Sequence, residues 1–315
     1  MSWLLAPTAQ PVLGGDFGYL SRAYAESLSE YGDPLHLNGS GGWLLKRPIP
    51  NTAFFDAMGT YPMFFCRNWQ ALPEDLAALP EDLASVTLVT PPAGNFSPAL
   101  LRRAFPDLLR PFKEHYLVNL SEDLDLAVNS HHRYYARRSR KQHQIGLHPL
   151  PVDLWEDWNR LYGELMIRHA ISGVAAFSPE GFRRQLAMPE MLAFAARKDG
   201  EITGIQLWLG HGDWVYHHLS AYSQTGYRTR VSYGLMWEAL GFFKQQGFAF
   251  ADLGAAAGNV RQKDGLSAFK SGWSNEKGTV YLGGRIVNRK LYRHLSGDAA
   301  SPFFPAYRDP ERHNG

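Results

Sequence analysis

The amino-acid sequence predicts an α/β protein of the layered α+β kind, in which a mixed central sheet is flanked by helices. Three observations support this fold class. Apolar strand segments alternate with amphipathic helical segments, the connections between them are short, and three strand-like segments follow one another between residues 191 and 220. Elements joined in this way pack as layers around a common core. A chain of 315 residues accommodates two such domains.

The first 120 residues carry the weaker signals and are assigned to an N-terminal domain, 1–120. Its apolar periodicity and turn residues define alternating helices and strands. The expected elements are a helix over 17–30, strands at 43–45 and 53–55, a helix over 74–83, a strand at 86–89, a helix over 96–112 with a break at Pro106, and a strand at 115–120.

Residues 121–295 form the second predicted domain, and their pattern is clearer. A helix over 154–169 is followed by one that begins at Ser178-Pro179, where Ser is a good N-cap and Pro suits the first turn. Three strands are expected next, at 191–197, 202–209 and 214–220. Because the turns between them are short, we predict that they form an antiparallel meander.

A helix that begins at Ser232 follows the meander and ends at Gly247. It leads into a buried strand at 248–253, and a last strand pair is expected at 279–282 and 284–287. Residues 296–315, rich in proline and charge, are expected to form a tail outside the two domains.

Bulk composition restricts the function classes. A net charge of +2 gives no global attraction for nucleic acid or membrane, so any polyanion must meet a local patch. The single cysteine, Cys66, excludes an internal disulfide and a thiolate metal cage, and its apolar surroundings predict a buried, inert thiol. No zinc or calcium motif is present, so we predict no metal. Because the sequence shows neither a signal peptide nor an apolar stretch long enough to span a bilayer, we expect a cytoplasmic protein. We also expect it to be a monomer or a homodimer.

The order of elements from residue 121 onward resembles that of the GNAT acetyltransferase fold. Four strings within it are similar to FemAB-like proteins, a family that includes the aminoacyltransferases that build peptidoglycan cross-bridges. The strings are the Arg/Lys-rich segment 131–141, the loop and helix start at 222–238, the Gly-x-x-x-x-Asp-x-Gly strand at 247–254, and Phe269-Lys270 followed by Tyr281-Leu-Gly283. The resemblance covers about residues 115–295 and implies tandem GNAT-like domains, with acyl-CoA or aminoacyl-tRNA as donor substrate.

The donor's phosphates have candidate partners near the start of the helix at Ser232. A helix N-terminus presents free backbone N–H groups and a partial positive charge. Arg228 and Arg230 lie just upstream, and no acidic residue occurs between Asp213 and Glu238. Acetyl-CoA enzymes of the GNAT superfamily carry a glycine-rich turn here, whereas this chain has only Gly234. The choice between coenzyme A and tRNA therefore stays open.

Acyl transfer to an amine needs a proton acceptor, stabilisation of the oxyanion and protonation of the leaving group. His217 and His218 on the third strand of the meander are candidate bases, and alternation places them on opposite faces. Asp252 ends a buried strand, a common position for site residues. By the Phe-Lys resemblance, Lys270 is implied to lie near the acyl group or an acceptor phosphate.

The segment 131–141 contains Arg133, Arg137 and Lys141 on one helical face, which suits a tRNA or a nucleotide-linked acceptor. Tyr222, at the start of the loop string, is included in this acceptor or polyanion group. Each of these charged residues has a plain alternative as part of a solvated surface.

These observations predict an N-acyltransferase that moves an acyl or aminoacyl group by direct attack of an amine. The amine belongs to a small molecule or to a nucleotide-linked cell-wall precursor. A non-catalytic GNAT-fold binding module for a nucleotide-linked ligand or RNA is the alternative, because fold does not secure function. An unrelated α/β enzyme is the third possibility, and a central strand pair that fails to splay would favour it.

Overall fold

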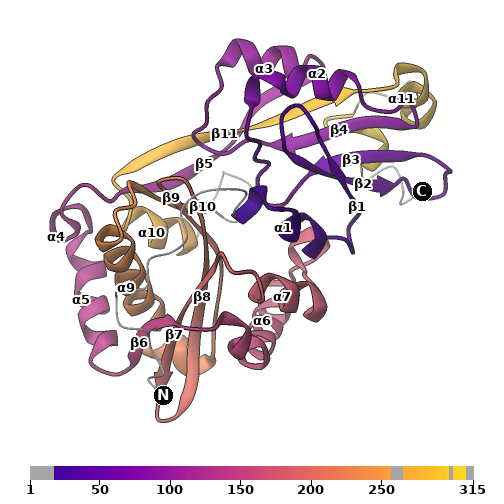
Figure 1. Cartoon of the computed structure of the whole chain (residues 1–315). Coiled ribbons are helices and arrows are strands. Elements are labelled where there is room, and N and C mark those ends of the chain that lie inside the picture. Colours follow the sequence, from indigo (N-terminus) through magenta and orange to yellow (C-terminus); the bar gives the residue numbers. More distant parts are fainter. Residues whose placement is uncertain (1–17, 257–264, 298–300, 310–315) are drawn as a thin grey trace. The chain divides into compact units, whose positions relative to one another are not determined.

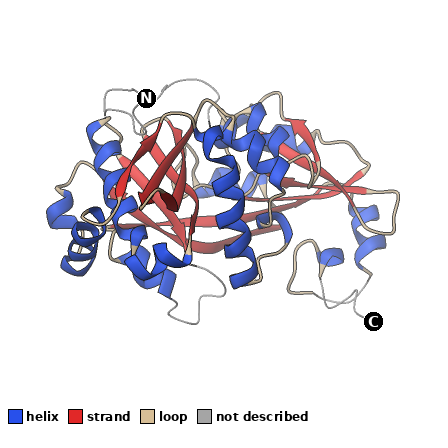
Figure 2. Cartoon of the chain, turned by 90° about the horizontal axis from the view of Figure 1, so that it is seen from below, coloured by secondary structure: helices blue, strands red, loops and turns tan. Residues whose placement is uncertain are grey.

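A computed structural model describes residues 18–256, 265–297 and 301–309 (Figure 1). Its internal contacts divide the chain into two compact units. Unit 1 comprises Gly18 and the described residues of 114–278, and unit 2 comprises residues 19–113 and the described residues of 279–309. The two units are described separately, and in each of them helices flank the strands (Figure 2).

Unit 2 contains a five-stranded sheet in the order β1-β2-β3-β4-β11. All of its strand pairs are antiparallel except β3 with β4, which run parallel. Its elements are a 3-10 turn at Gly18–Leu20, α1 (Arg22–Ser27), β1 (Asp33–His36), β2 (Trp43–Pro48), β3 (Phe55–Gly59), a 3-10 turn at Trp69–Ala71, α2 (Leu72–Ala77), β4 (Leu83–Val89), α3 (Pro98–Ala104), β11 (Glu276–Ile286), which begins in unit 1, α11 (Arg289–Ser296) and a 3-10 turn at Ala306–Arg308.

Unit 1 contains a six-stranded sheet in the order β5-β10-β9-β8-β7-β6, and only β9 and β10 pair in parallel. Its elements are β5 (Leu108–Asn119), which begins in unit 2, α4 (Leu124–Ala127), α5 (Ser130–Arg140), β6 (Gln144–His148), a 3-10 turn at Pro151–Leu154, α6 (Trp155–His169), a 3-10 turn at Gly173–Ala175, α7 (Pro179–Leu186), β7 (Met191–Lys198), β8 (Glu201–His211), β9 (Trp214–Tyr222), α8 (Gln224–Thr229), α9 (Val231–Gln245), β10 (Phe250–Ala255) and α10 (Gly265–Ser271).

The apolar face of α9 forms the core of unit 1. Leu235, Ala239 and Phe243 are fully buried against strand residues such as Val215 and Ala251. Full burial of a leucine or phenylalanine side chain stabilises a fold by roughly 1.5–3 kcal/mol. The helix therefore fixes the position of β9 and β10, the two strands that carry most of the candidate site.

Unit 2 has a core of its own, built on the same plan. Leu76 of α2 and Leu101 of α3 pack against Ala57 and Val86 of the parallel strand pair. Cys66 lies in this core, and burial raises the pKa of its thiol well above the ordinary value. This thiol is therefore protonated at neutral pH and chemically quiet.

The two units share one arrangement of elements. In unit 2 the meander β1-β2-β3 is followed by α2 and by β4 parallel to β3, and in unit 1 the meander β7-β8-β9 is followed by α9 and by β10 parallel to β9. The predicted layered α/β class, with mixed sheets flanked by helices and one arrangement in each of two units, is confirmed. The expected meander and the N-cap at Ser178 are also present, and Ser178 accepts a hydrogen bond from the N–H of Gly181.

Several predicted elements were wrong in type or extent. The helix expected over 96–112 ends at Ala104, and β5 already begins at Leu108 because Pro106 cannot continue a helix. The last strand pair is a single strand, β11. The short elements β1 and α8 escaped prediction, since a few residues show too little periodicity to be recognised.

The division into units also differs from the predicted domain boundaries, 1–120, 121–295 and 296–315. Residues 279–297 belong to unit 2, where β11 pairs with β4. Within the described part of the expected tail, Tyr307 is buried and Arg308 forms an ion pair with Asp56. A segment held by a buried ion pair is part of a domain, whatever its proline and charge content.

Candidate functional site

The parallel strands β9 and β10 separate partway along their length. They pair at three positions, Trp214 with Phe250, Val215 with Ala251 and Tyr216 with Asp252. β9 then continues to Tyr222 and β10 to Ala255 without further pairing to each other. This is the splayed strand pair whose absence would have favoured an unrelated fold.

Asp252 stands at the last paired position and is held by two donors. Its side chain is 1% exposed, and its oxygens lie 3.0 and 2.8 Å from Nδ1 of His115 on the neighbouring strand β5. The backbone N–H of Gly254 donates to Oδ1 at 2.7 Å. Carboxylate oxygens accept hydrogen bonds, so Nδ1 of His115 is the donor to Asp252, and Nε2 is the ring nitrogen outside this pair.

The pairing of His115 with Asp252 fixes the orientation of the imidazole ring, which is 9% exposed. Asp252 also raises the pKa of the Tyr216 hydroxyl, although burial is the larger cause and Asp213 a smaller one. His115 was missed in the sequence, because nothing there indicates that β5 lies beside β10.

Lys270 lies against the end of β10. Its Nζ donates to the carbonyl of Ala255 at 2.6 Å, and it stands 3.3 Å from the point where a Cβ on Gly254 would lie. Lys270 is half-buried on α10. It is therefore placed at the splayed strands near Asp252, whose N–H donor is the same Gly254.

His217 lies just beyond the last paired position of β9. Its ring packs on Trp208, with ring centroids 4.8 Å apart, and its buried Nε2 has no hydrogen-bond partner among the described residues. Burial lowers its pKa to about 3, assisted by the charge of Lys270 and by His218. A base of such low pKa takes up a proton poorly at neutral pH.

His218 points to the opposite face of the sheet. A β-bulge lies here, since Trp208 pairs with His217 while Leu207 pairs with Leu219. His218 hydrogen-bonds to Gln185 of α7 at 3.1 Å, and burial lowers its pKa to about 3 as well. The side chain of His218 therefore contacts α7 on that face of the sheet.

The predicted donor residues surround the junction between α8 and α9. Arg230 joins the two helices in the left-handed conformation (φ 55°), and its guanidinium lies 3.9 Å from the ring centre of Tyr135. Arg228 is exposed on α8 and bonds to Thr225, while Ser232 is half-buried in the first turn of α9.

Gly234 has a packing role in the structure. A Cβ at this position would lie 2.5 Å from Cδ1 of Ile145 and 2.6 Å from Oγ of Ser139. Glycine is required here because α9 approaches α5 closely. The sequence alone had grouped Gly234 with phosphate-binding residues, whereas its contacts are with α5 and β6.

The predicted basic face of α5 divides into different environments. Arg140 forms an ion pair with Glu238 of α9, and Arg137 bonds to the carbonyl of Arg133 at 3.3 Å. Arg133 is half-buried, and its Nε has no hydrogen-bond partner among the described residues. Lys141 follows the helix and is exposed.

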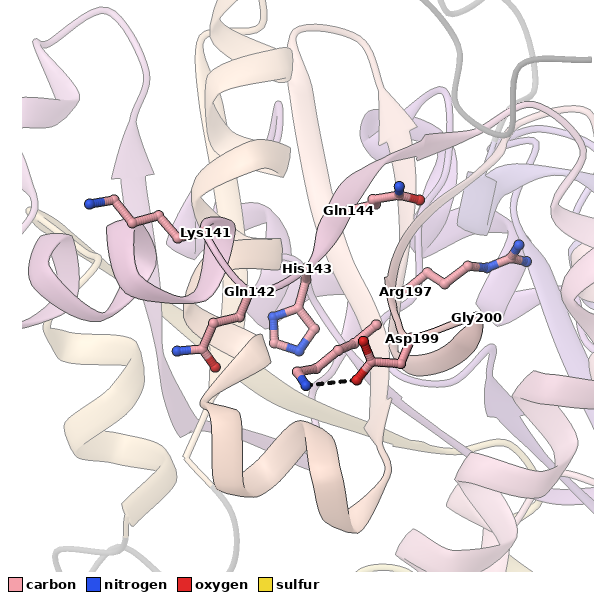
Figure 3. Close-up of a pocket in the computed structure, with 8 residues that line it drawn as sticks. Lys141, Gln142, His143, Gln144, Arg197, Asp199 and Gly200 are labelled. Atoms are coloured by element: carbon pink, nitrogen blue, oxygen red, sulfur yellow. Dashed lines mark hydrogen bonds and ion pairs between the residues drawn. The ribbon is translucent and has the colours of Figure 1, made fainter.

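A pocket of about 550 Å³ opens where α5 meets β6 and β7 turns into β8 (Figure 3). Lys141, Arg197 and Lys198 line it together with Asp199, which accepts from Lys198 at 2.9 Å. His143 lies between this pocket and α8, because its Nε2 bonds to the Thr229 hydroxyl at 3.1 Å. Burial lowers the pKa of His143, so its ring is neutral at physiological pH. The charged groups that line the pocket are therefore three cations and one carboxylate.

Tyr222 lies close to the same end of the sheet. Its hydroxyl accepts a hydrogen bond from Gln206 at 3.1 Å, and its ring packs edge-on against Tyr227 of α8. Burial raises its pKa to about 12, so it is a neutral donor or acceptor at physiological pH.

Comparison with solved structures supports this fold. FemX aligns with a TM-score of 0.63 at 11% identity, covering 87% of this chain and 93% of that one. The C-terminal domain of a putative lysylphosphatidylglycerol synthetase from Agrobacterium fabrum gives 0.57 at 16%, covering 85% and 88%. L-PGS from Bacillus licheniformis gives 0.52 at 15%, covering 86% and 93%. The chain therefore shares its fold with FemX and with these two structures.

At these identities the likeness establishes the fold alone. No known family matches the sequence, and no curated protein matches it either. Within the described residues, no three or more His, Cys, Asp or Glu side chains gather as a metal site would require. None of the described helices combines the length and apolar character of a membrane span.

Proposed function

We propose that this chain is an N-acyltransferase, cytoplasmic as the sequence leads us to expect. It moves an acyl or aminoacyl group from acyl-CoA or aminoacyl-tRNA to the amine of a small-molecule or cell-wall-precursor acceptor. The observation that carries the proposal is the group of His115, Asp252 and Lys270 at the splayed strands β9 and β10. A FemAB-like GNAT fold with an oriented base and a nearby ammonium suits acyl transfer to nitrogen.

Each residue has a defined part in the proposed reaction. Nε2 of His115 accepts a proton from the acceptor amine, while Asp252 stabilises the imidazolium that forms. The amine nitrogen attacks the acyl carbonyl, so a C–N bond forms and the C–S bond of a thioester or the C–O bond of a ribose ester breaks. The proton on His115 then passes to the leaving sulfur or oxygen.

Lys270 supplies electrostatic stabilisation in this proposal. Its ammonium group lies at the carboxyl end of β10, where it can meet the negative oxygen of the tetrahedral intermediate or an acceptor phosphate. His217 stays neutral beside it because its pKa is about 3. A second cation next to Lys270 would repel it, so a neutral ring is compatible with this role.

The donor's phosphates are assigned to the end of the sheet where α8 and α9 meet. Arg228 and Arg230 lie there, and His143 connects α8 to the cationic pocket that contains Lys141. A guanidinium pairs well with phosphate oxygens, and a lysine adds a point charge. Coenzyme A and the acceptor end of tRNA both present such phosphates.

Two binding measurements on the full chain separate these donors. Calorimetric titration with coenzyme A and acetyl-CoA is run beside filter binding of mixed aminoacyl-tRNA at two salt concentrations. An acyl-CoA enzyme gives heat with the CoA ligands that is lost in an Arg228→Ala/Arg230→Ala variant. A tRNA-dependent enzyme gives salt-sensitive retention of tRNA, also reduced in that variant. Arg184→Ala, an exposed arginine on α7, is the matched control.

Transfer of labelled acyl or aminoacyl groups to amines then tests catalysis. Lys270→Met keeps the length of the side chain and removes its charge, so donor binding should persist while transfer falls sharply. If a donor binds to the wild type and no amine acceptor is ever modified, the non-catalytic binding module replaces this proposal. If neither donor binds, the assignment of Arg228 and Arg230 fails.

A further inference from the structure

The parallel strand pair of unit 2 also ends at an open space. β3 and β4 pair at Phe55 with Leu83, Ala57 with Val86 and Met58 with Thr87, and the pairing stops there. In open α/β sheets, ligands bind beyond the carboxyl ends of the strands, where neighbouring connections diverge. The equivalent position in unit 1 is occupied by the candidate acyltransferase site.

A cavity of about 270 Å³ lies at these strand ends. Its walls come from the end of β3 and the following loop, from the end of β4, from β11 and from residues 304–308. Most of the surface is apolar, with Met58, Leu88, Leu282 and Phe304 among the side chains. A space of this size accommodates a small organic molecule with a short apolar chain.

Two arginines form the charged end of the cavity. Arg47 of β2 and Arg308 both line it, and no aspartate or glutamate is among the described residues that do so. Both guanidinium groups form ion pairs with the same carboxylate, Asp56 of β3, which is only 1% exposed. Asp56 also accepts a hydrogen bond from the Tyr307 hydroxyl. Two positive charges therefore share one negative charge, which leaves one positive charge uncompensated.

The hydrogen bonds of this cluster leave donors available. Arg47 bonds to Asp56 through Nε and Nη2, and Arg308 uses Nε and Nη2 for Asp56 and the carbonyl of Pro48. Nη1 of neither arginine donates to a described residue. Oγ1 of Thr87, on the cavity wall, is buried and has no hydrogen-bond partner among them. Buried polar groups of this kind are normally satisfied, so a ligand with acceptor oxygens would complete the site.

We propose that this cavity is a second binding site, which takes a small organic carboxylate with an apolar chain. The carboxylate neutralises the excess charge of the Arg47–Asp56–Arg308 cluster and accepts from the planar guanidinium groups, whose geometry matches it. The apolar chain lies along Met58, Leu282 and Phe304. All of the residues concerned belong to unit 2, so the site does not depend on the acyltransferase proposal.

Calorimetric titration of the full chain with hexanoate tests this site, with hexanamide as the uncharged ligand of the same shape. Hexanoate should bind with a Kd in the millimolar range or tighter, and hexanamide should bind about tenfold more weakly or not at all. Arg308→Gln restores a one-to-one pairing of Arg47 with Asp56, so it should weaken hexanoate binding by about tenfold. Arg103→Gln, an exposed arginine of the same unit, should leave binding unchanged.

A second variant keeps the experiment decisive if Arg308→Gln does not fold. Thr87→Val has the same shape and keeps both arginines, and it should weaken hexanoate binding by a few-fold through loss of one hydrogen bond. Absence of binding to the wild type would overturn the proposal. Equal binding of hexanoate and hexanamide, or an unchanged Kd in folded Arg308→Gln, would overturn it as well.

Discussion

The two units place different chemistry on the same strand arrangement. In unit 1 the buried carboxylate, Asp252, faces the titratable ring of His115, whereas in unit 2 the buried carboxylate, Asp56, faces the permanently charged groups of Arg47 and Arg308. An imidazole gains and loses a proton near neutral pH, but a guanidinium does not. If both proposals hold, one strand arrangement carries a proton acceptor in unit 1 and a fixed charge for ligand binding in unit 2.

The largest expected effect is on transfer activity after a change in His115. His115→Gln keeps a donor for Asp252 but removes the atom that accepts a proton from the amine. Under the proposed mechanism kcat/KM should fall by about 10²- to 10⁴-fold. His36→Gln, an exposed histidine in unit 2, is the control and should transfer at the wild-type rate.

If the transfer rate of His115→Gln stays within a few-fold of wild type, His115 does not act as the base, and the proposed difference in chemistry between the two units is lost. Such a rate would mean that a group other than His115 accepts the proton from the amine.

The next effect concerns the stability of unit 2. Asp56→Ala leaves two guanidinium groups, about one quarter exposed or less, without their counterion. Removal of one partner of a buried ion pair typically costs about 3–5 kcal/mol, and urea denaturation should show a loss of that order. Asp82→Ala, which removes the exposed partner of Lys46, should cost about 1 kcal/mol or less. A small loss for Asp56→Ala would show that its charge is dispensable in unit 2.

Much of unit 1 was predictable from its sequence, and the reasons differ between elements. The meander strands and α9 are long and strongly periodic, so their positions follow from local pattern. Local strings that resemble FemAB-like proteins led to the choice of Asp252 and Lys270 as candidate site residues. His115 could not be added in this way, because it reaches Asp252 only through the sheet order, which places β5 next to β10.

The sequence alone was less informative for unit 2. Its proposed binding site depends on Arg47, Asp56 and Arg308, and Arg308 lies in the segment that was predicted to be a tail outside the domains. No local pattern connects residues so far apart in the chain. For Gly234, the place at a helix start led to the prediction of phosphate binding, and the structure adds a packing role that the sequence did not indicate.

A third prediction uses the buried histidines of unit 1. His218 has its pKa lowered to about 3 in the folded protein, so the folded state resists protonation while the unfolded chain takes up a proton near pH 6.5. Stability should therefore fall as the pH drops below about 6.5, by about 1.4 kcal/mol per pH unit for each such histidine. Between pH 7 and pH 5, the unfolding free energy of wild type should decrease by about 2 kcal/mol more than that of His218→Asn.

Denaturant titrations at several pH values between 5 and 7 measure this difference. Parallel lines for wild type and His218→Asn would show that His218 is protonated in the folded state. Unit 2 supplies the control, since His36 is exposed there and His36→Asn should not alter the slope. A shallower pH dependence in His218→Asn, together with an unchanged one in His36→Asn, would assign the acid sensitivity to the buried histidine of unit 1.

The smallest expected effect is on donor binding at the cationic pocket of unit 1. Lys141 is exposed and lines that pocket, so Lys141→Gln should weaken binding of the phosphate-bearing donor by only a few-fold at physiological salt. For a tRNA donor, the slope of log K against log salt should decrease by about one phosphate contact. Lys290→Gln makes the same change at an exposed position of unit 2 and should alter neither the affinity nor the slope. If Lys290→Gln weakens donor binding as much as Lys141→Gln does, both units attract the donor through general surface charge, and the pocket has no separate role.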